Sequence, residues 1–204
     1  VALVTTHMPL SEVPKGISKE LIEGKLKILN SALKRDFRVD NPRIAVLGLN
    51  PHAGDNGLLG NEEQEIILPA IEEMQKTNNI LCSGPFPADG FFGTGRYRDF
   101  DGVLAMYHDQ GLIPFKTIAM DSGVNFTAGL PVVRTSPDHG TAYDIVGKNQ
   151  ASIESFLQAV YTAIDIFNNR AVYDEAHGNP LNKMFFDRGR DDEKLDLTEE
   201  EDID

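Results

Sequence analysis

Cysteine and basic residues are scarce in this sequence, and long apolar runs are absent. The single cysteine, Cys82, excludes a disulfide framework and a zinc site of several thiolates, and it is typical of a protein of the reducing cytoplasm. No run of about 18 apolar residues occurs, so we expect no membrane span. The 19 Lys and Arg are outnumbered by 32 Asp and Glu, and this net charge of −13 argues against nucleic acid as the main partner.

The remaining composition is that of an ordinary globular protein. Hydrophobic residues make up 41% and charged residues 25%, which excludes collagen, a coiled coil and global disorder. The length of 204 residues predicts one large α/β domain, or one domain with an arm. Residues 187–204 hold ten acidic and three basic residues. We therefore expect a folded unit over residues 1–186 and a disordered, solvated tail over 187–204.

The first residues, V-A-L-V-T-T-H, are apolar and lack the basic start of a signal peptide. They read like the inside of a strand, and Val1 is not a methionine. We therefore expect the chain to be truncated within a domain.

Apolar periodicity predicts strands alternating with helices, the pattern of an α/β domain with a largely parallel sheet. Ser18 is a candidate helix cap, and Pro69 should kink or restart its helix. Phe156, Val160 and Phe167, together with Ala163, form one apolar stripe of an amphipathic closing helix. The expected strands are 1–5, 43–49, 80–83, 102–107 and 131–135; the helices are 18–37, one from about 62, and 152–168; 84–95 is expected to be a loop.

Three histidines, His7, His52 and His108, each follow a predicted strand. The carboxyl ends of parallel strands share one edge of the sheet, where ligands bind in such folds. Three neutral imidazoles there suit Zn, Co, Ni, Mn or Fe. Alternatively, each is an unrelated loop histidine that is hydrogen-bonded to a neighbour.

Lys116, Asn125 and Arg134 follow one another at intervals of nine residues. Lysine is a point charge for phosphate, arginine a bidentate donor and asparagine a neutral donor, so the three could bind an anion. Spacing alone does not distinguish this set from solvated surface residues.

Two glycine-rich segments are candidates for phosphate binding. The stretch from Gly93 fails the dinucleotide fingerprint, because Arg98 stands where the third glycine belongs. The loop Gly54–Gly60 could direct backbone N–H groups toward a phosphate, or its glycines could serve only a tight turn.

Two aspartates could orient a histidine or balance the charge of a metal, namely Asp89 and Asp109. The alternative is a turn carboxylate for Asp89 and a helix-start acid for Asp109. Cys82 is interpreted as a small buried hydrophobic residue rather than a nucleophile.

Six blocks of sequence together resemble one known family over about residues 1–170. They are V-T-T-H-M-P-L (4–10), G-L-N-P-H-A-G (48–54), G-P-F-P-A-D (84–89), Y-H-D-Q-G-L-I-P-F-K (107–116), N-F-T-A-G-L-P-V-V-R-T-S (125–136) and D-H-G-T-A-Y-D-I-V-G (138–147). The chain resembles the carboxyl-terminal part of the PdxA family of 4-hydroxythreonine-4-phosphate dehydrogenases.

This resemblance implies an α/β fold like that of isocitrate and isopropylmalate dehydrogenases, with the amino-terminal half of the family fold absent. Those relatives lack the usual dinucleotide fingerprint and hold the adenosine half of the cofactor in an H-G-S-A-P-D-I-A-G-like loop. By similarity, the candidate NAD or NADP ligands are His139, Gly140, Thr141, Ala142 and Asp144.

The resemblance also implies roles for the residues singled out above. It makes His7, His52 and His108 ligands of a divalent metal (Zn, Mg, Co, Mn or Ni), which is shared across a homodimer interface. The substrate-binding residues would be Lys116, Asn125 and Arg134. Asp89 and Asp109 are the candidate catalytic residues on the argument given above, not on the resemblance. The family's substrate-binding His-Thr pair upstream of the first metal ligand is absent here, so we expect this chain alone to be inactive.

The implied reaction is the metal-dependent, NAD(P)-linked oxidation of 4-phosphohydroxy-L-threonine. Decarboxylation to 3-amino-2-oxopropyl phosphate would follow, in pyridoxal 5'-phosphate (vitamin B6) biosynthesis in the cytoplasm. Two alternatives stay open. One is a related dehydrogenase of a phosphorylated four-carbon sugar acid, phosphoerythronate or phosphothreonate. The other is an inactive fragment that binds metal and phosphate.

Overall fold

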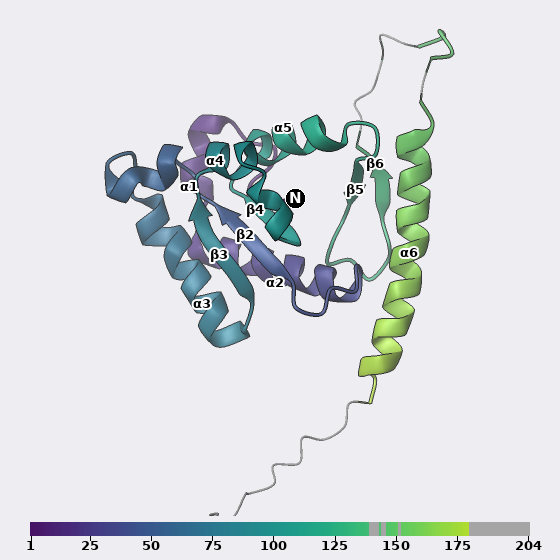
Figure 1. The fold of residues 1–204 in the computed structure, drawn as a ribbon, viewed down its shortest axis with the longest axis horizontal. Helices are drawn as coiled ribbons and strands as arrows, with labels where there is room; N and C mark the ends of the chain where they lie inside the picture. Colours follow the sequence, from purple (N-terminus) through teal and green to yellow (C-terminus); the bar gives the residue numbers. More distant parts are fainter. Residues whose placement is uncertain (139–142, 144–145, 151, 180–204) are drawn as a thin grey trace, which may run out of the picture.

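The structure is a computed structural model that describes residues 1–138, 143, 146–150 and 152–179 (Figure 1). Four parallel strands form one sheet in the order β1-β4-β2-β3. The strands are β1 (Ala2–Leu3), β2 (Arg43–Leu47), β3 (Leu81–Phe86) and β4 (Gly102–Ala105). The predicted fold class, an α/β domain with a largely parallel sheet and flanking helices, is confirmed.

Helices and short turns connect these strands and cover the sheet (Figure 1). The α-helices are α1 (Val13–Gly16), α2 (Lys19–Arg35), α3 (Leu68–Asn78), α4 (Ala88–Gly93), α5 (His108–Ala119) and α6 (Glu154–His177). The turns are η1 (Leu10–Glu12), η2 (Pro51–Gly57), the π-helical η3 (Glu63–Ile67) and η4 (Arg96–Asp99).

The core forms on both faces of the sheet because the side chains of β2 alternate between them. Ile44 and Val46 pack with buried residues of α2 and α3, whereas Ala45 and Leu47 pack on the other face with Phe91 of α4. These four of the five β2 residues are fully buried, as expected for a strand covered on both sides, and only Arg43 at its start is exposed.

Helix α2 begins and ends close to the predicted positions. Ser18 caps it, because its side-chain oxygen accepts a hydrogen bond from the Leu21 N–H at 3.2 Å. Ile22 and Leu26, four residues apart, are fully buried and form the apolar face of the helix. The helix ends at Arg35, so Phe37 lies beyond it and is exposed.

The prediction for Pro69 is also confirmed. The π-helical turn η3 precedes α3, which starts at Leu68 with Pro69 in its first turn. A proline is tolerated there because the first N–H groups of a helix have no partner within it.

The prediction of a loop over residues 84–95 is wrong. Strand β3 continues to Phe86, and α4 occupies Ala88–Gly93. Packing of aromatic side chains explains why this segment is regular. Phe86 stacks on Phe91, with ring centroids 5.4 Å apart, and both contact Phe100. This aromatic cluster covers the second face of the sheet.

The predicted strand at residues 131–135 is also wrong in place and in pairing. Strand β5 (Val124–Phe126) pairs antiparallel with β6 (Thr135–Pro137) in a separate two-stranded ribbon. Figure 1 shows this ribbon beside α6 and apart from the four-stranded sheet. Pro131 lies in the connection, where it cannot donate to a strand ladder.

The expected helix over 152–168 exists but is longer, because α6 runs from Glu154 to His177. Its predicted apolar stripe is not the buried face. Phe156 is 60% exposed and Phe167 is 68% exposed, whereas Ala159 and Ile166 are buried toward the ribbon and α2. The periodicity therefore identified the helix but not the face that it buries within this chain.

Among the described helices, none combines the length and apolar character that a membrane span requires. The predicted acidic tail, 187–204, lies outside the described residues.

Candidate functional site

His7 and His108 meet at the carboxyl edge of the sheet, as the strand-end argument predicts. Strands β1 and β4 are neighbours, and their pairing continues past both ends: Thr5 donates its N–H at 3.1 Å and its hydroxyl at 2.8 Å to the carbonyl of Met106. The buried Thr5 thereby holds together the two segments of the chain that lead into His7 and His108. The His7 and His108 ring centroids lie 6.0 Å apart.

Asp109 lies against His108 at the start of α5. Its Oδ1 is 2.7 Å from His108 Nδ1. A carboxylate accepts a hydrogen bond, so this contact favours the tautomer with the proton on Nδ1 and leaves Nε2 free as a ligand. Asp109 therefore lies where it can orient the imidazole.

His52 comes from a different kind of structure. It lies in η2, where His52, Ala53, Gly54, Asp55 and Asn56 all have positive φ. The left-handed backbone conformation costs about 1–2 kcal/mol at each residue other than glycine. The turn must therefore be held by contacts outside itself.

Glu63 supplies such contacts, although no local sequence pattern marks it as a functional residue. Its Oε1 accepts the N–H groups of Leu49 and Asn50, both at 2.7 Å, and its Oε2 accepts Asn50 Nδ2 at 3.0 Å. The residue is only 3% exposed. A Cβ on Gly54 would stand 2.6 Å from Glu63 Oε2 and 2.9 Å from the backbone oxygen of Gly60, and Gly54 has a φ of +81°, so glycine is required there. These contacts favour the tight-turn interpretation of the 54–60 loop.

The three histidines do not form one group in this chain. Within the described residues, no set of three or more His, Cys, Asp or Glu side chains is arranged to hold a metal ion. His7 and His108 are adjacent, and His52 is not assembled with them into such a group.

The predicted anion-binding residues lie on α5 and on the ribbon. Lys116 Nζ is 3.6 Å from Asp138 Oδ2, and Arg134 Nη1 donates to Thr127 Oγ1 at 2.8 Å. The register pairs Asn125 with Ser136, and the Thr127 N–H donates to the Arg134 carbonyl at 3.0 Å. Paired residues share a face of the ribbon, and so do residues two positions apart in one strand. Arg134 therefore lies on the same side as Ser136 and its partner Asn125.

The positions of Asp89 and Cys82 give no support for a catalytic role. Asp89 is exposed in the first turn of α4 and forms no ion pair with the described residues. Cys82 is buried, and burial raises the pKa of its thiol to about 11. The thiolate is therefore scarce at neutral pH, in agreement with the interpretation of Cys82 as a buried hydrophobic residue.

The candidate cofactor residues His139, Gly140, Thr141, Ala142 and Asp144 lie outside the described residues.

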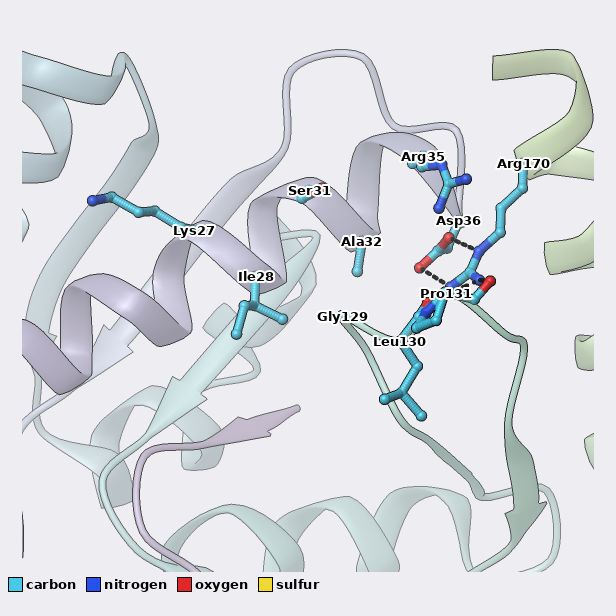
Figure 2. A pocket seen from close by; sticks show the side chains of 10 residues that line it. All are labelled: Lys27, Ile28, Ser31, Ala32, Arg35, Asp36, Gly129, Leu130, Pro131 and Arg170. Carbon is cyan, nitrogen blue, oxygen red and sulfur yellow. Dashed lines mark hydrogen bonds and ion pairs between the residues drawn. The ribbon is translucent and has the colours of Figure 1, made fainter. Parts of the chain in front are cut away.

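A groove of about 530 Å³ lies away from the histidines, between α2 and the connection of the ribbon (Figure 2). None of the predicted site residues lines it. At one end of the groove, Asp36, the residue directly after α2, and Arg170 of α6 form a buried ion pair. Neither residue carries a local sequence signal, because they are far apart in the chain.

The fold and the side chains at the sheet edge define an α/β domain of the type that binds its ligand at the carboxyl ends of parallel strands. The family model described as "Pyridoxal phosphate biosynthetic protein PdxA" matches residues 1–163, and the chain belongs to this family.

Relatives and solved structures agree with this assignment. A 4-hydroxythreonine-4-phosphate dehydrogenase of Bacteroides thetaiotaomicron is 61% identical over 97% of this chain and 54% of its own length. One from Prosthecochloris aestuarii is 55% identical over 83% of this chain and 50% of its own. The crystal structure of the Klebsiella pneumoniae 4-hydroxythreonine-4-phosphate dehydrogenase matches with a TM-score of 0.70 and 41% identity, over 80% of this chain and 50% of that one. The chain thus spans about half the length of the relatives that it matches.

Proposed function

We propose that the protein carrying this chain is a 4-hydroxythreonine-4-phosphate dehydrogenase of vitamin B6 biosynthesis. It would oxidise 4-phosphohydroxy-L-threonine with NAD or NADP and a divalent metal. The observation that carries the proposal is the 61% identity to a relative of that name over 97% of the chain. The adjacent His7 and His108 and the shared face of Asn125 and Arg134 support it.

The donor chemistry of the candidate site suits a divalent metal. Imidazole is a good ligand for Zn, Co and Ni, and His108 is oriented by Asp109 as metal-binding histidines commonly are. His7, His52 and His108 would hold the ion. Because one chain assembles only two of these imidazoles, we propose that a homodimer shares the site and that a second copy completes it.

In the proposed reaction, a hydride passes from the carbinol carbon of the substrate to NAD(P)⁺, and the hydroxyl proton is released. The β-keto acid that results loses CO₂ and becomes 3-amino-2-oxopropyl phosphate. A bound divalent metal supplies Lewis acidity to the oxygen at the reacting carbon.

The residues of this chain would bind and orient the substrate. Lys116, Asn125 and Arg134 would bind the phosphate, which lies away from the reacting carbon. Binding energy from this remote phosphate orients the substrate for the chemical step. Asp109 would keep His108 in the tautomer that presents Nε2.

Steady-state assays of the complete natural protein test this proposal. We expect NAD(P)H formation with 4-phosphohydroxy-L-threonine, dependent on a divalent metal, and 3-amino-2-oxopropyl phosphate as the product. Phosphoerythronate and phosphothreonate are the comparison substrates. A higher kcat/KM on either one would reassign the substrate, and turnover on none of the three would contradict the dehydrogenase assignment.

A further inference from the structure

Two ion pairs join the end of α2 to α6, and they differ in burial. Arg35 and Asp174 form the outer pair, with Nη2 and Oδ2 2.6 Å apart and side chains 34% and 53% exposed. Asp36 and Arg170 form the inner pair, with Nε 2.6 Å from Oδ1 and Nη2 3.3 Å from Oδ2. The inner side chains are only 4% and 8% exposed. Figure 2 shows the inner pair at the end of the groove.

The Arg170 guanidinium also contacts the ribbon. Its Nη1 donates to the carbonyl oxygens of Leu130 and Pro131, at 3.2 and 3.4 Å. Both carbonyls belong to the connection between β5 and β6 (Figure 2). One buried cation therefore links α2, α6 and this connection, and Asn169 adds a 2.8 Å hydrogen bond to the Asp36 carbonyl.

The ribbon has few other supports on the side of the sheet. It shares no strand pairing with the four-stranded sheet. Thr135 Oγ1 donates to the Ala159 carbonyl of α6 at 2.9 Å, and Phe126 packs edge-on against Phe37, with ring centroids 5.6 Å apart. Lys116 of α5 also reaches Asp138, the residue after β6, at 3.6 Å. At α2 itself, the inner pair holds the connection of the ribbon through the carbonyls of Leu130 and Pro131.

We propose that Asp36 and Arg170 are positioning residues for substrate binding. They hold the connection 127–134, and through it Asn125 and Arg134, at a fixed separation from His7 and His108. The substrate class that this arrangement selects is a short acid whose phosphate and reacting carbon must reach both places at once. This inference rests on the proposed function, because it assumes that the ribbon binds the phosphate.

The physical argument is one of geometry. Arg170 itself touches no proposed substrate group, but a shift of the connection moves Arg134, three residues after Pro131. A misplacement of about 1 Å in a positioned group can lower the rate about a hundredfold. The loss should appear only for substrates that use the phosphate-binding residues.

The test compares inner and outer variants of the complete natural protein. Asp36→Asn, Arg170→Lys and Arg170→Gln alter the inner pair, and Arg35→Gln and Asp174→Asn are the matched outer controls on the same two helices. Each variant is assayed on 4-phosphohydroxy-L-threonine and on unphosphorylated 4-hydroxythreonine. Inorganic phosphate is titrated as a competitive inhibitor.

We expect Arg170→Gln to raise KM for the phosphorylated substrate at least tenfold and to weaken inhibition by phosphate in parallel. On the unphosphorylated substrate, kcat/KM should stay within about twofold, which is about 0.4 kcal/mol. For Arg170→Lys, we expect a KM between those of the wild type and Arg170→Gln, because an ammonium keeps the charge but cannot span Asp36 and both carbonyls. The outer controls should match the wild type.

Equal losses on both substrates, or an unchanged KM in folded inner variants, would overturn the inference. If Arg170→Gln does not fold, the double variant Asp36→Leu/Arg170→Met decides. It removes both buried charges and retains apolar volume, yet it still lacks the two carbonyl contacts, so KM should rise as before. Arg134→Ala separates the two proposals. If it raises KM while the inner variants do not, only this inference fails; if it has no effect, the phosphate-binding assignment fails as well.

Discussion

In the four-stranded sheet, Ile44, Val46 and Leu104 are fully buried, whereas none of the six residues of β5 and β6 is buried. His7 and His108 are therefore placed by strands that an apolar core holds in register. Asn125 and Arg134 are placed by a short ribbon that packs on α6 and whose connection is anchored to α2 by an ion pair and a few side-chain hydrogen bonds. Apolar burial in the sheet is distributed over many contacts, but the anchoring of the ribbon's connection to α2 relies on a few polar groups. Single polar substitutions should therefore affect the ribbon more selectively than the sheet.

The largest effect should come from the sheet edge itself. His108→Ala removes an imidazole that lies 6.0 Å from His7, so we expect loss of turnover, of bound metal and of dimer stability. Metal analysis and sedimentation, with and without chelator, measure the last two. His177→Ala is the control, because this histidine stacks on Tyr173 at the end of α6. A His108→Ala protein with stoichiometric metal and full turnover would remove His108 from the site.

The second prediction concerns the left-handed turn behind His52. Glu63→Ala leaves the partly buried N–H groups of Leu49 and Asn50 without their acceptor, at up to roughly 1–3 kcal/mol for each donor. We expect the free energy of unfolding to fall by about 2–5 kcal/mol in urea denaturation. Glu65→Ala, an exposed glutamate of the same turn, should change it by less than about 0.5 kcal/mol. Similar losses in the two variants would show that Glu63 does not hold the turn.

The third prediction tests the ribbon directly. Arg134→Ala should raise KM for the phosphorylated substrate about ten- to a hundredfold, because a charge-assisted hydrogen bond contributes roughly 1.5–3 kcal/mol. Lys116→Ala should behave similarly. Lys76→Ala, an exposed pair partner of Glu72 on α3, is the control and should leave KM unchanged. If Arg134→Ala or Lys116→Ala keeps kcat/KM within about twofold of the wild type, that residue does not bind the phosphate.

The same contrast explains which features were predictable from the sequence. Helix α2 was predictable because Ser18 caps it and Ile22 and Leu26 repeat at helical spacing. The proximity of His7 and His108 was predictable because parallel strands end at one edge. Both arguments use local periodicity and a general property of parallel sheets.

The remaining features depend on contacts between distant parts of the chain. The strands β5 and β6 have three residues each, too few to show an alternating pattern. The pairing of Asp36 with Arg170 joins residues 134 positions apart, and no spacing rule indicates it. Glycine and asparagine in N-P-H-A-G-D-N-G signalled a turn, but its sustained left-handed course became visible only with the Glu63 contacts.

The smallest effect should come from the outer ion pair, and it should depend on pH. The hydrogen bond from Arg35, followed by the Arg35 charge, lowers the pKa of the Asp174 carboxyl below its ordinary value of 3.8. A lowered folded-state pKa adds stability above pH 3.8, and this is lost as the pH falls through the lower value. Asp174→Asn should therefore lower Tm slightly near pH 7, less so at high salt, and not at all once the wild-type carboxyl is protonated. Asp165→Asn, an exposed position of α6, is the control. A Tm difference that persists unchanged at the acid end would assign the effect to packing rather than charge.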